Sequence, residues 1–174
     1  MHALIVGAVG VGKSTLISKV LKELNCSAAG FLTKKEDSLA DPAKGSPLYF
    51  YEVGAHGEPV RKHLFGYCKD KVPLTFPEAF DAAAGYVGSI CGGDVIVMDE
   101  IGTMEAVSPR FRSAVLSILD GSVPVIAAVK DKDAPFPEAV RSHPNCRCFT
   151  VNTENRDRLF EQVLAFMKEQ LAGG

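Results

Sequence analysis

The chain has 174 residues, of which 19 are Lys or Arg and 21 are Asp or Glu, so its formal charge is −2 at neutral pH. This length predicts a single domain over residues 1–174 with at most a small insertion. With 47% hydrophobic and 23% charged residues the chain can bury a core, which excludes a disordered protein.

Charge and cysteine content also indicate which binding partners and which cellular compartment to expect. A slightly negative chain without a basic block argues against nucleic acid or an anionic membrane as an electrostatic partner. We expect no membrane span and no secretion signal. The five cysteines are an odd number without ligand spacing, so they predict reduced thiols in the cytoplasm, and a zinc site is the less favoured alternative.

Short apolar runs alternate along the chain with segments of helical periodicity, which is the pattern of βα units that build a largely parallel sheet. The expected strands are residues 3–6, 28–32, 95–98, 123–129 and 146–151. Their apolar character is continuous, as in strands that are covered on both faces. We therefore expect a three-layer α/β domain.

Three helices have recognisable ends. Thr75, followed three residues later by Glu78, predicts a capping box at the start of the first. Ser108 followed by Pro109 predicts the start of the second, and the third is expected from about Asn155. Asn155 is interpreted as a helix cap, with nucleotide contact as the alternative.

Residues 34–67 have a different composition, with loop-forming residues first and a strand-like stretch over 49–53. This segment is too short for a core of its own. We expect a small antiparallel insertion that lies against the sheet edge or over a binding cleft.

The first expected strand is followed by a phosphate-binding motif, G-x-x-x-x-G-K-[ST], that opens a helix. Its residues are Gly7, Ala8, Val9, Gly10, Val11, Gly12, Lys13, Ser14 and Thr15. Glycines let backbone N–H groups converge on phosphate oxygens. Lys13 is expected to bind the β and γ phosphates, and the Ser14 hydroxyl to bind Mg²⁺. We call residues 7–15 the phosphate loop.

Asp99 and Glu100 end a buried strand, where open α/β folds place their ligands. We expect Asp99 to lie beside the phosphate loop and to hold Mg²⁺ with Ser14. Glu100 is expected to orient a water molecule and to take up its proton as general base. An exposed pair that merely ends the strand is the alternative interpretation.

The long interval between Lys13 and Asp99 leaves room for another strand between the two motif strands, which favours the additional-strand, catalytic-glutamate type of P-loop protein. A competing interpretation takes residues 99–102 as a D-x-x-G switch of the GTPase type. The guanine-binding N-K-x-D motif is missing, since Lys130-Asp131-Lys132-Asp133 lacks the Asn.

The phosphate loop, D-E-I-G-x-M-E over residues 99–105, Gly30-Phe31-Leu32-Thr33 and Thr153-Glu154-Asn155-Arg156 occur in a characteristic order. With these motifs the chain resembles the cancer-related nucleoside-triphosphatase family over most of its length. The resemblance implies a P-loop NTPase fold and Mg²⁺-dependent hydrolysis of ATP, GTP and other NTPs to NDPs with loose base preference. It also implies the roles of Lys13, Ser14, Asp99 and Glu100 given above.

The chain departs from the family at Lys34-Lys35-Glu36, where an acidic-Val-Arg run is usual, and over residues 65–72. A cation that stabilises the transferred charge is sought among Lys34, Lys35, Arg110, Arg112 and Arg156, although each alone is more typical of a solvated surface. The four histidines, His2, His56, His63 and His143, have no ligand spacing and are interpreted as ordinary surface or loop residues.

Three functions are compatible with these motifs. The first is a nucleoside-triphosphatase in which water attacks the γ-phosphate. The second is a kinase that passes the same phosphoryl group to a small molecule or nucleotide, because a phosphate loop serves both reactions. The third is a nucleotide-dependent binding module whose slow hydrolysis resets a partner contact.

Overall fold

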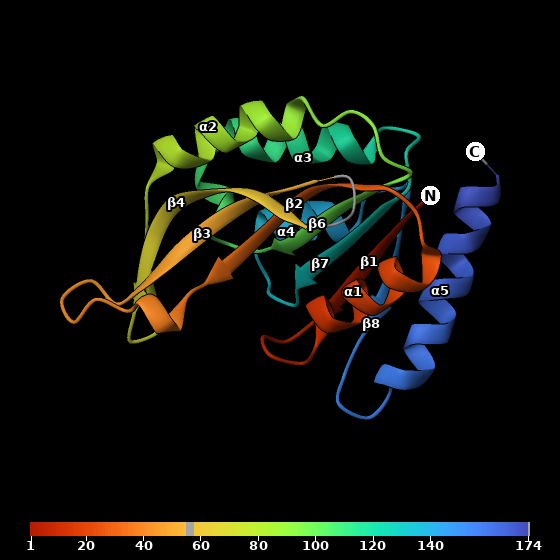
Figure 1. The fold of residues 1–174 in the computed structure, drawn as a ribbon, viewed down its shortest axis with the longest axis horizontal. Helices are drawn as coiled ribbons and strands as arrows, with labels where there is room; N and C mark the ends of the chain where they lie inside the picture. The colour runs from red at the N-terminus through yellow and green to blue at the C-terminus, as the bar shows by residue number, and fades with distance from the viewer. Residues whose placement is uncertain (55–57, 174) are drawn as a thin grey trace.

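The computed structural model describes residues 1–54 and 58–173. Its centre is one eight-stranded sheet in the order β5-β4-β3-β2-β6-β7-β1-β8 (Figure 1). The strands are β1 (His2–Gly7), β2 (Ala28–Lys35), β3 (Ser46–Val53), β4 (Pro59–Lys69), β5 (Val72–Thr75), β6 (Val95–Ile101), β7 (Val125–Lys130) and β8 (Cys146–Thr150).

The sheet has a parallel part and an antiparallel part. Strands β2, β6, β7, β1 and β8 pair in parallel, whereas β3, β4 and β5 extend the β2 edge by antiparallel pairing. Strand β7 lies between β1 and β6, so an additional strand separates the phosphate-loop strand from the acidic strand, as the sequence predicts. The antiparallel part continues beyond residue 67, because β5 adds a short edge strand.

In the part of the chain that the structure describes, five α-helices cover the two faces of the sheet. They are α1 (Lys13–Leu24), α2 (Pro77–Gly88), α3 (Pro109–Leu119), α4 (Pro135–Arg141) and α5 (Arg156–Ala172). Helices α2, α3 and α4 pack on one face, and α1 and α5 lie side by side on the other (Figure 1). The three-layer architecture is confirmed.

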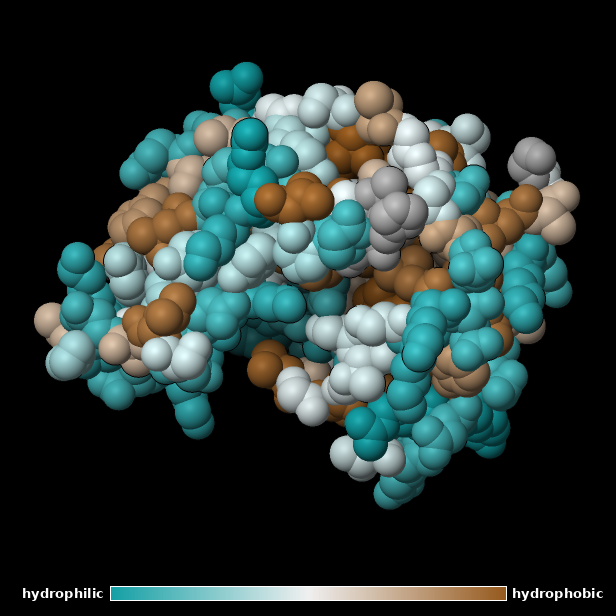
Figure 2. Space-filling view, viewed as in Figure 1, coloured by the Kyte–Doolittle hydropathy of each residue, from teal (hydrophilic) through white to brown (hydrophobic). Residues whose placement is uncertain are grey.

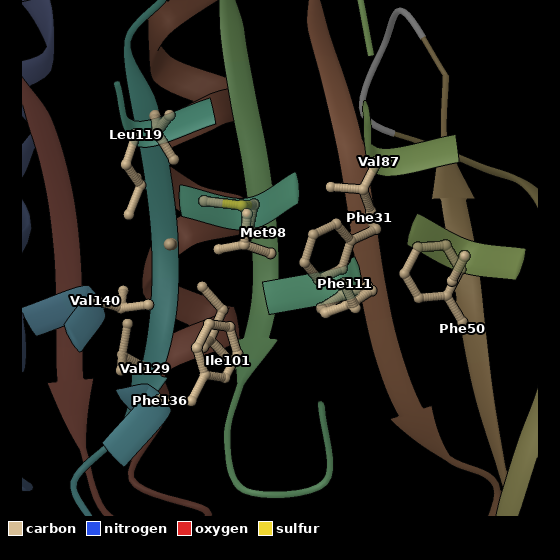
Figure 3. Close-up of a cluster of buried hydrophobic side chains, with 14 of the residues drawn as sticks. Phe31, Phe50, Val87, Met98, Ile101, Phe111, Leu119, Val129, Phe136 and Val140 are labelled. Carbon is tan, nitrogen blue, oxygen red and sulfur yellow. The ribbon is translucent and has the colours of Figure 1, made fainter. Parts of the chain in front are cut away.

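Each face of the sheet carries its own apolar cluster. On the α2 and α3 side, Phe31 stacks on Phe50 with ring centroids 5.1 Å apart, and Phe111 meets Phe31 edge-on at 5.5 Å (Figure 3). On the other side, α1 and α5 bury residues against β1 and β7. All six residues of β1 are buried, which explains why the apolar run in this strand is continuous.

The helix starts were predicted with mixed success. Ser108 caps α3, since its side chain accepts a hydrogen bond from the Phe111 N–H at 3.0 Å. The capping box at Thr75 was wrong. Thr75 pairs with Gly66 in the β4–β5 ladder, and α2 begins after Phe76 without a side-chain cap. Helix α4, which opens with Pro135, was not predicted.

Two further expectations concern side chains outside the site. All five cysteines carry free thiols. His2 is not a surface residue, since it is 1% exposed and its Nε2 lies 2.9 Å from the Leu119 carbonyl oxygen. His56 lies outside the described residues.

Within residues 1–54 and 58–173, the structure contains no helix with the length and apolarity needed to cross a bilayer.

Candidate active site

Four parallel strands end at the same edge of the sheet, and each delivers residues to one place. Strand β1 leads into the phosphate loop, β6 carries Asp99 and Glu100 near its end, β7 ends at Lys130, and β2 contains Thr33. The same face of the molecule is hollowed between the antiparallel strands and the phosphate loop (Figures 1 and 2). The predicted motifs therefore meet, although they lie far apart in the sequence.

The phosphate loop joins β1 directly to α1. Gly12 is the N-cap residue of α1 and has φ of 100°, a left-handed conformation that suits glycine. The first turn of α1 therefore presents its N–H groups and the positive end of its dipole at the loop. Ser14 and Thr15 are exposed at this helix start, whereas Lys13 is buried.

The Lys13 side chain turns back into the loop. Its ammonium group donates to the carbonyl oxygens of Gly7 at 2.9 Å and Ala8 at 2.8 Å, and lies 3.2 Å from Glu100 Oε2. The side chain is only 3% exposed. The ammonium group and the N-terminal end of α1 together concentrate positive charge at the loop, which favours an anion there.

Asp99 and Ser14 form a pair of oxygen donors beside the loop. Asp99 is buried, and burial raises the pKa of its carboxyl, while a hydrogen bond from the Ser14 side chain and the charges of Lys13 and Lys34 oppose that rise. A carboxylate next to a hydroxyl is the ligand chemistry that a hard divalent cation prefers. These two side chains fit the expected Mg²⁺ ligands.

Glu100 is held by contacts from strands β2 and β7 and from the start of α1. Lys130 Nζ lies 2.9 Å from Glu100 Oε1, while Lys13 contacts the other carboxylate oxygen. The Thr33 hydroxyl accepts a hydrogen bond from the Glu100 backbone N–H at 3.1 Å. Because both the backbone and the carboxylate are fixed, Glu100 can present one defined face to a neighbouring reactant.

Two residues of this network, Lys130 and Glu105, were not predicted as site residues. Glu105 is 1% exposed and accepts a hydrogen bond from the Gly102 N–H at 2.9 Å. A Cβ atom built on Gly102 would lie 3.2 Å from Lys130 Nζ and 3.3 Å from Glu105 Oε2, so Gly102 lets the lysine and the second carboxylate come close.

The charges in this network shift one another's protonation. Burial lowers the pKa of Lys130, but the charge and hydrogen bond of Glu100 together with the charge of Glu105 oppose it, and the pKa of Lys130 lies above its ordinary value. Burial raises the pKa of Glu105 to about 6, although the Lys130 charge opposes the rise. The sequence offers one indication that Lys130 belongs to the site, which is that Lys130, like Glu100, lies close to the end of an expected strand.

The five candidate cations are dispersed. Lys34 lies over the Tyr51 ring at 5.7 Å, and its charge also acts on Asp99. Lys35 pairs with Asp37 at 2.9 Å in an exposed salt bridge. Two further candidates, Arg110 and Arg112, belong to α3 in the opposite helix layer. Arg156 is different, because its Nη1 would lie 2.9 Å from a Cβ atom built on Gly12. Its side chain covers the phosphate loop.

Asn155 takes the N-cap position of α5 without capping the helix. Its side chain instead accepts from the Asn152 N–H and donates to the Thr150 carbonyl, both at 2.9 Å. The expected helix cap is therefore replaced by bonds that fix the loop before α5. This loop carries Arg156 to the phosphate loop.

Comparison with known proteins gives a consistent result. A family model described as NTPase matches residues 2–44 and 70–164, which is more than half of the chain. The nucleoside-triphosphatase THEP1 of Thermotoga petrophila is 33% identical over 176 residues, covering 97% of this chain and 93% of that protein. THEP1 of Thermotoga maritima is 31% identical, with 97% and 96% covered.

Two solved structures are similar over nearly the whole chain. The crystal structure of THEP1 from Aquifex aeolicus has a TM-score of 0.68 and 26% identity, with 97% of this chain and 99% of that chain covered. The solution structure of a human cancer-related nucleoside triphosphatase has a TM-score of 0.70 and 24% identity, with 97% of each chain covered, and supports the fold. The chain therefore belongs to the NTPase family and has its P-loop NTPase fold.

Proposed function

We propose that this protein is an Mg²⁺-dependent nucleoside-triphosphatase that hydrolyses ATP, GTP and other NTPs to NDP and phosphate with loose base preference. The observation that carries the proposal is the convergence of the Lys13 ammonium group with Glu100 and Asp99 at the start of α1. The names of the relatives in Thermotoga support the same activity. The proposed catalytic residues are Lys13 and Glu100.

The phosphate loop is proposed to bind the triphosphate through its backbone N–H groups, which carry no information about the base. Lys13 exchanges its bonds to the Gly7 and Ala8 carbonyl oxygens for bonds to the β and γ phosphates. Because these carbonyl bonds are neutral contacts and phosphate oxygens are charged, the exchange favours the bound triphosphate.

Asp99 and Ser14 are the residues that would hold Mg²⁺. The fit rests on the donor set, a buried carboxylate hydrogen-bonded to an exposed hydroxyl. When bound, the ion supplies neutralisation of charge on the phosphate oxygens. Within the described residues, no group of three or more His, Cys, Asp or Glu side chains lies together as a metal site would require.

Glu100 is proposed as the general base. It accepts a proton from the water that attacks the γ-phosphorus, the bond to the bridging oxygen breaks, and the NDP leaves with that oxygen. When Lys13 turns to the phosphates, Lys130 remains on Glu100 Oε1 and Thr33 remains on its backbone. These two contacts keep the carboxylate in place during the reaction.

The test is phosphate release from ATP, GTP, CTP and UTP with and without Mg²⁺, for the parent and for Glu100→Gln. General-base catalysis contributes about 10²-fold or more, so the variant should bind ATP as the parent does and lose at least about 99% of its turnover. A variant that hydrolyses ATP at the parent's rate would exclude Glu100 as the base. Phosphate release that is the same without Mg²⁺ would exclude the metal.

A further inference from the structure

The antiparallel part of the sheet reaches beyond the helices that cover one of its faces. Helices α1 and α5 pack on β1 and β7, whereas β3 and β4 extend away from these two helices (Figure 1). The opposite face of β3 and β4 packs on α2, where the ring centroids of Phe65 and Phe80 lie 4.9 Å apart. The face of β3, β4 and β5 on the α1 side therefore extends past its helix layer.

Strand alternation places three tyrosines on this face. Tyr49 and Tyr51 flank Phe50 on β3, and because Phe50 packs in the cluster on the α2 side, both tyrosines point the other way. Their ring centroids lie 6.1 Å apart. On β4, Tyr67 lies opposite Pro47, two residues before Tyr49, so its ring shares the same face.

The edge of the face is exposed. Leu74 of β5 lies opposite Tyr67, and Val72 lies opposite Lys69, so both aliphatic side chains point to this face. They are 66% and 69% exposed. Large apolar side chains with this exposure, next to exposed lysines and tyrosine rings, are typical of a surface that meets a partner.

A lysine ammonium group lies over each of the three rings. The pairs, with the distance from Nζ to the ring centroid, are Lys62 with Tyr49 at 4.5 Å, Lys44 with Tyr67 at 5.5 Å and Lys34 with Tyr51 at 5.7 Å. All three lysines are exposed. One carboxylate, Glu36, accepts a hydrogen bond from the Tyr51 hydroxyl at 2.7 Å, so these side chains together carry a net positive charge. We call the three tyrosines and their lysines the tyrosine face.

The fold gathers lysines that are dispersed in the sequence. Lys34 belongs to β2, Lys44 precedes β3, and Lys62 belongs to β4. The expectation against a nucleic-acid partner rests on the absence of a basic block and on the charge of −2. Neither property reports where separate strands place their lysines.

A ring beside a cation, repeated three times on a sheet surface, matches the chemistry of a single-stranded nucleic acid. Unpaired bases stack on aromatic side chains, and lysines bind the phosphates between them. Sheets that present aromatic residues on neighbouring strands bind single-stranded RNA in this manner. A duplex keeps the faces of its bases stacked on one another, and an acidic peptide has carboxylates for the lysines but no bases for the rings.

We propose that the tyrosine face binds single-stranded nucleic acid, with bases on the tyrosine rings and phosphates at the lysines. The face adjoins the candidate active site, since the charge of Lys34 acts on Asp99. The inference does not rest on the proposed function, because neither the phosphate loop nor Glu100 takes part in this binding.

The test measures dissociation constants by fluorescence anisotropy, without NTP and over a range of NaCl concentrations. The probes are labelled oligouridine and oligothymidine of about twelve nucleotides, a site size within the range of such surfaces, together with a duplex of equal length and polyglutamate. Tyr49→Leu removes a ring and keeps an apolar side chain, and Lys62→Gln removes a charge. Lys168→Gln, which replaces an exposed lysine on α5, is the matched control. Circular dichroism establishes that each variant is folded.

The two variants should change different quantities. Tyr49→Leu should bind the single strands at least about fivefold more weakly, with the salt dependence of the parent, because one stacking contact is lost. Lys62→Gln should reduce the slope of log K against log salt by about 0.7, which corresponds to one phosphate contact on a single strand. Lys168→Gln should match the parent in both quantities.

Four results would overturn the proposal. The parent could bind no oligonucleotide, or bind the duplex as tightly as the single strands. Tyr49→Leu could retain the parent's affinity, which would exclude stacking. Polyglutamate could bind as tightly as the oligonucleotides, which would assign the face to an acidic protein segment. A preference for oligouridine or for oligothymidine would support the proposal and identify the sugar. Since NTP is absent, a failure of the proposed hydrolase activity would change none of these results.

Discussion

Glu105 gives a prediction whose size follows from the structure. Its side chain is 1% exposed, one carboxylate oxygen accepts the Gly102 N–H, and the other has no hydrogen-bond partner among the residues that the structure describes. Replacement by Gln keeps the shape and the acceptor for Gly102 but removes the titrating group. The variant therefore isolates the cost of burying this charge.

The sign follows from the two pKa values. Burial raises the pKa of folded Glu105 from 4.5 to about 6, so between these values the folded state binds more protons than the unfolded state. Stability that is present below about pH 4.5 is therefore lost as the pH rises through 6. The shift corresponds to a loss of about 2 kcal/mol in the free energy of unfolding.

The measurement is the free energy of unfolding in urea from pH 4 to pH 7.5, for the parent and for Glu105→Gln. The difference between them cancels the other titrating groups, and it should move by about 2 kcal/mol in favour of the variant over this range. Glu169→Gln, which replaces an exposed carboxylate on α5, serves as the matched control. A flat difference for Glu105→Gln would refute the argument from burial.

Three other substitutions test the site. Lys13→Ala should weaken ATP and tripolyphosphate binding alike by about tenfold or more, because charge-assisted hydrogen bonds are lost; calorimetry measures both, and unchanged affinity would contradict the phosphate role. Lys130→Met should lower kcat by about tenfold or more with little change in KM, and it should shift the pH profile of kcat. Lys130→Arg should restore part of the activity. An unaltered pH profile in Lys130→Met would mean that Lys130 is only a structural contact. Thr33→Val removes the acceptor for the Glu100 N–H and should cost about 1–3 kcal/mol of stability in urea titrations, along with turnover; a fully active, equally stable variant would count against this bond.

The sequence allowed prediction of the phosphate loop and the acidic pair because each is a contiguous motif on a recognisable strand. Residues 7–15 combine glycines, a lysine and a hydroxyl in one short segment, so their expected phosphate-binding role can be deduced from neighbouring residues alone. Asp99 follows an unbroken apolar run. Strand order was also accessible in part, since the interval between Lys13 and Asp99 indicates an intervening strand. The roles assigned to these residues stay predictions until the variants are measured.

Contacts that depend on tertiary placement could not be predicted in the same way. Lys130 lies in Lys-Asp-Lys-Asp, which is typical of a charged surface loop, and only its place beside Glu100 distinguishes it. Thr75 is a good helix cap by local criteria, but pairing with Gly66 in the sheet takes precedence. Arg156 resembles any exposed arginine until the loop before α5 brings it onto Gly12.

Strand order explains why one carboxylate has two lysine partners. Because β7 lies between β1 and β6, the strand next to Glu100 ends in Lys130, while Lys13 comes from the loop one strand further away. The two ammonium groups therefore contact different oxygens of Glu100, at 2.9 and 3.2 Å. If only one lysine were present, binding of a triphosphate by that lysine would release the carboxylate. With two lysines, Lys13 can bind the phosphates while Lys130 keeps Glu100 directed at the attacking water. The inserted strand β7 therefore contributes to the proposed chemistry.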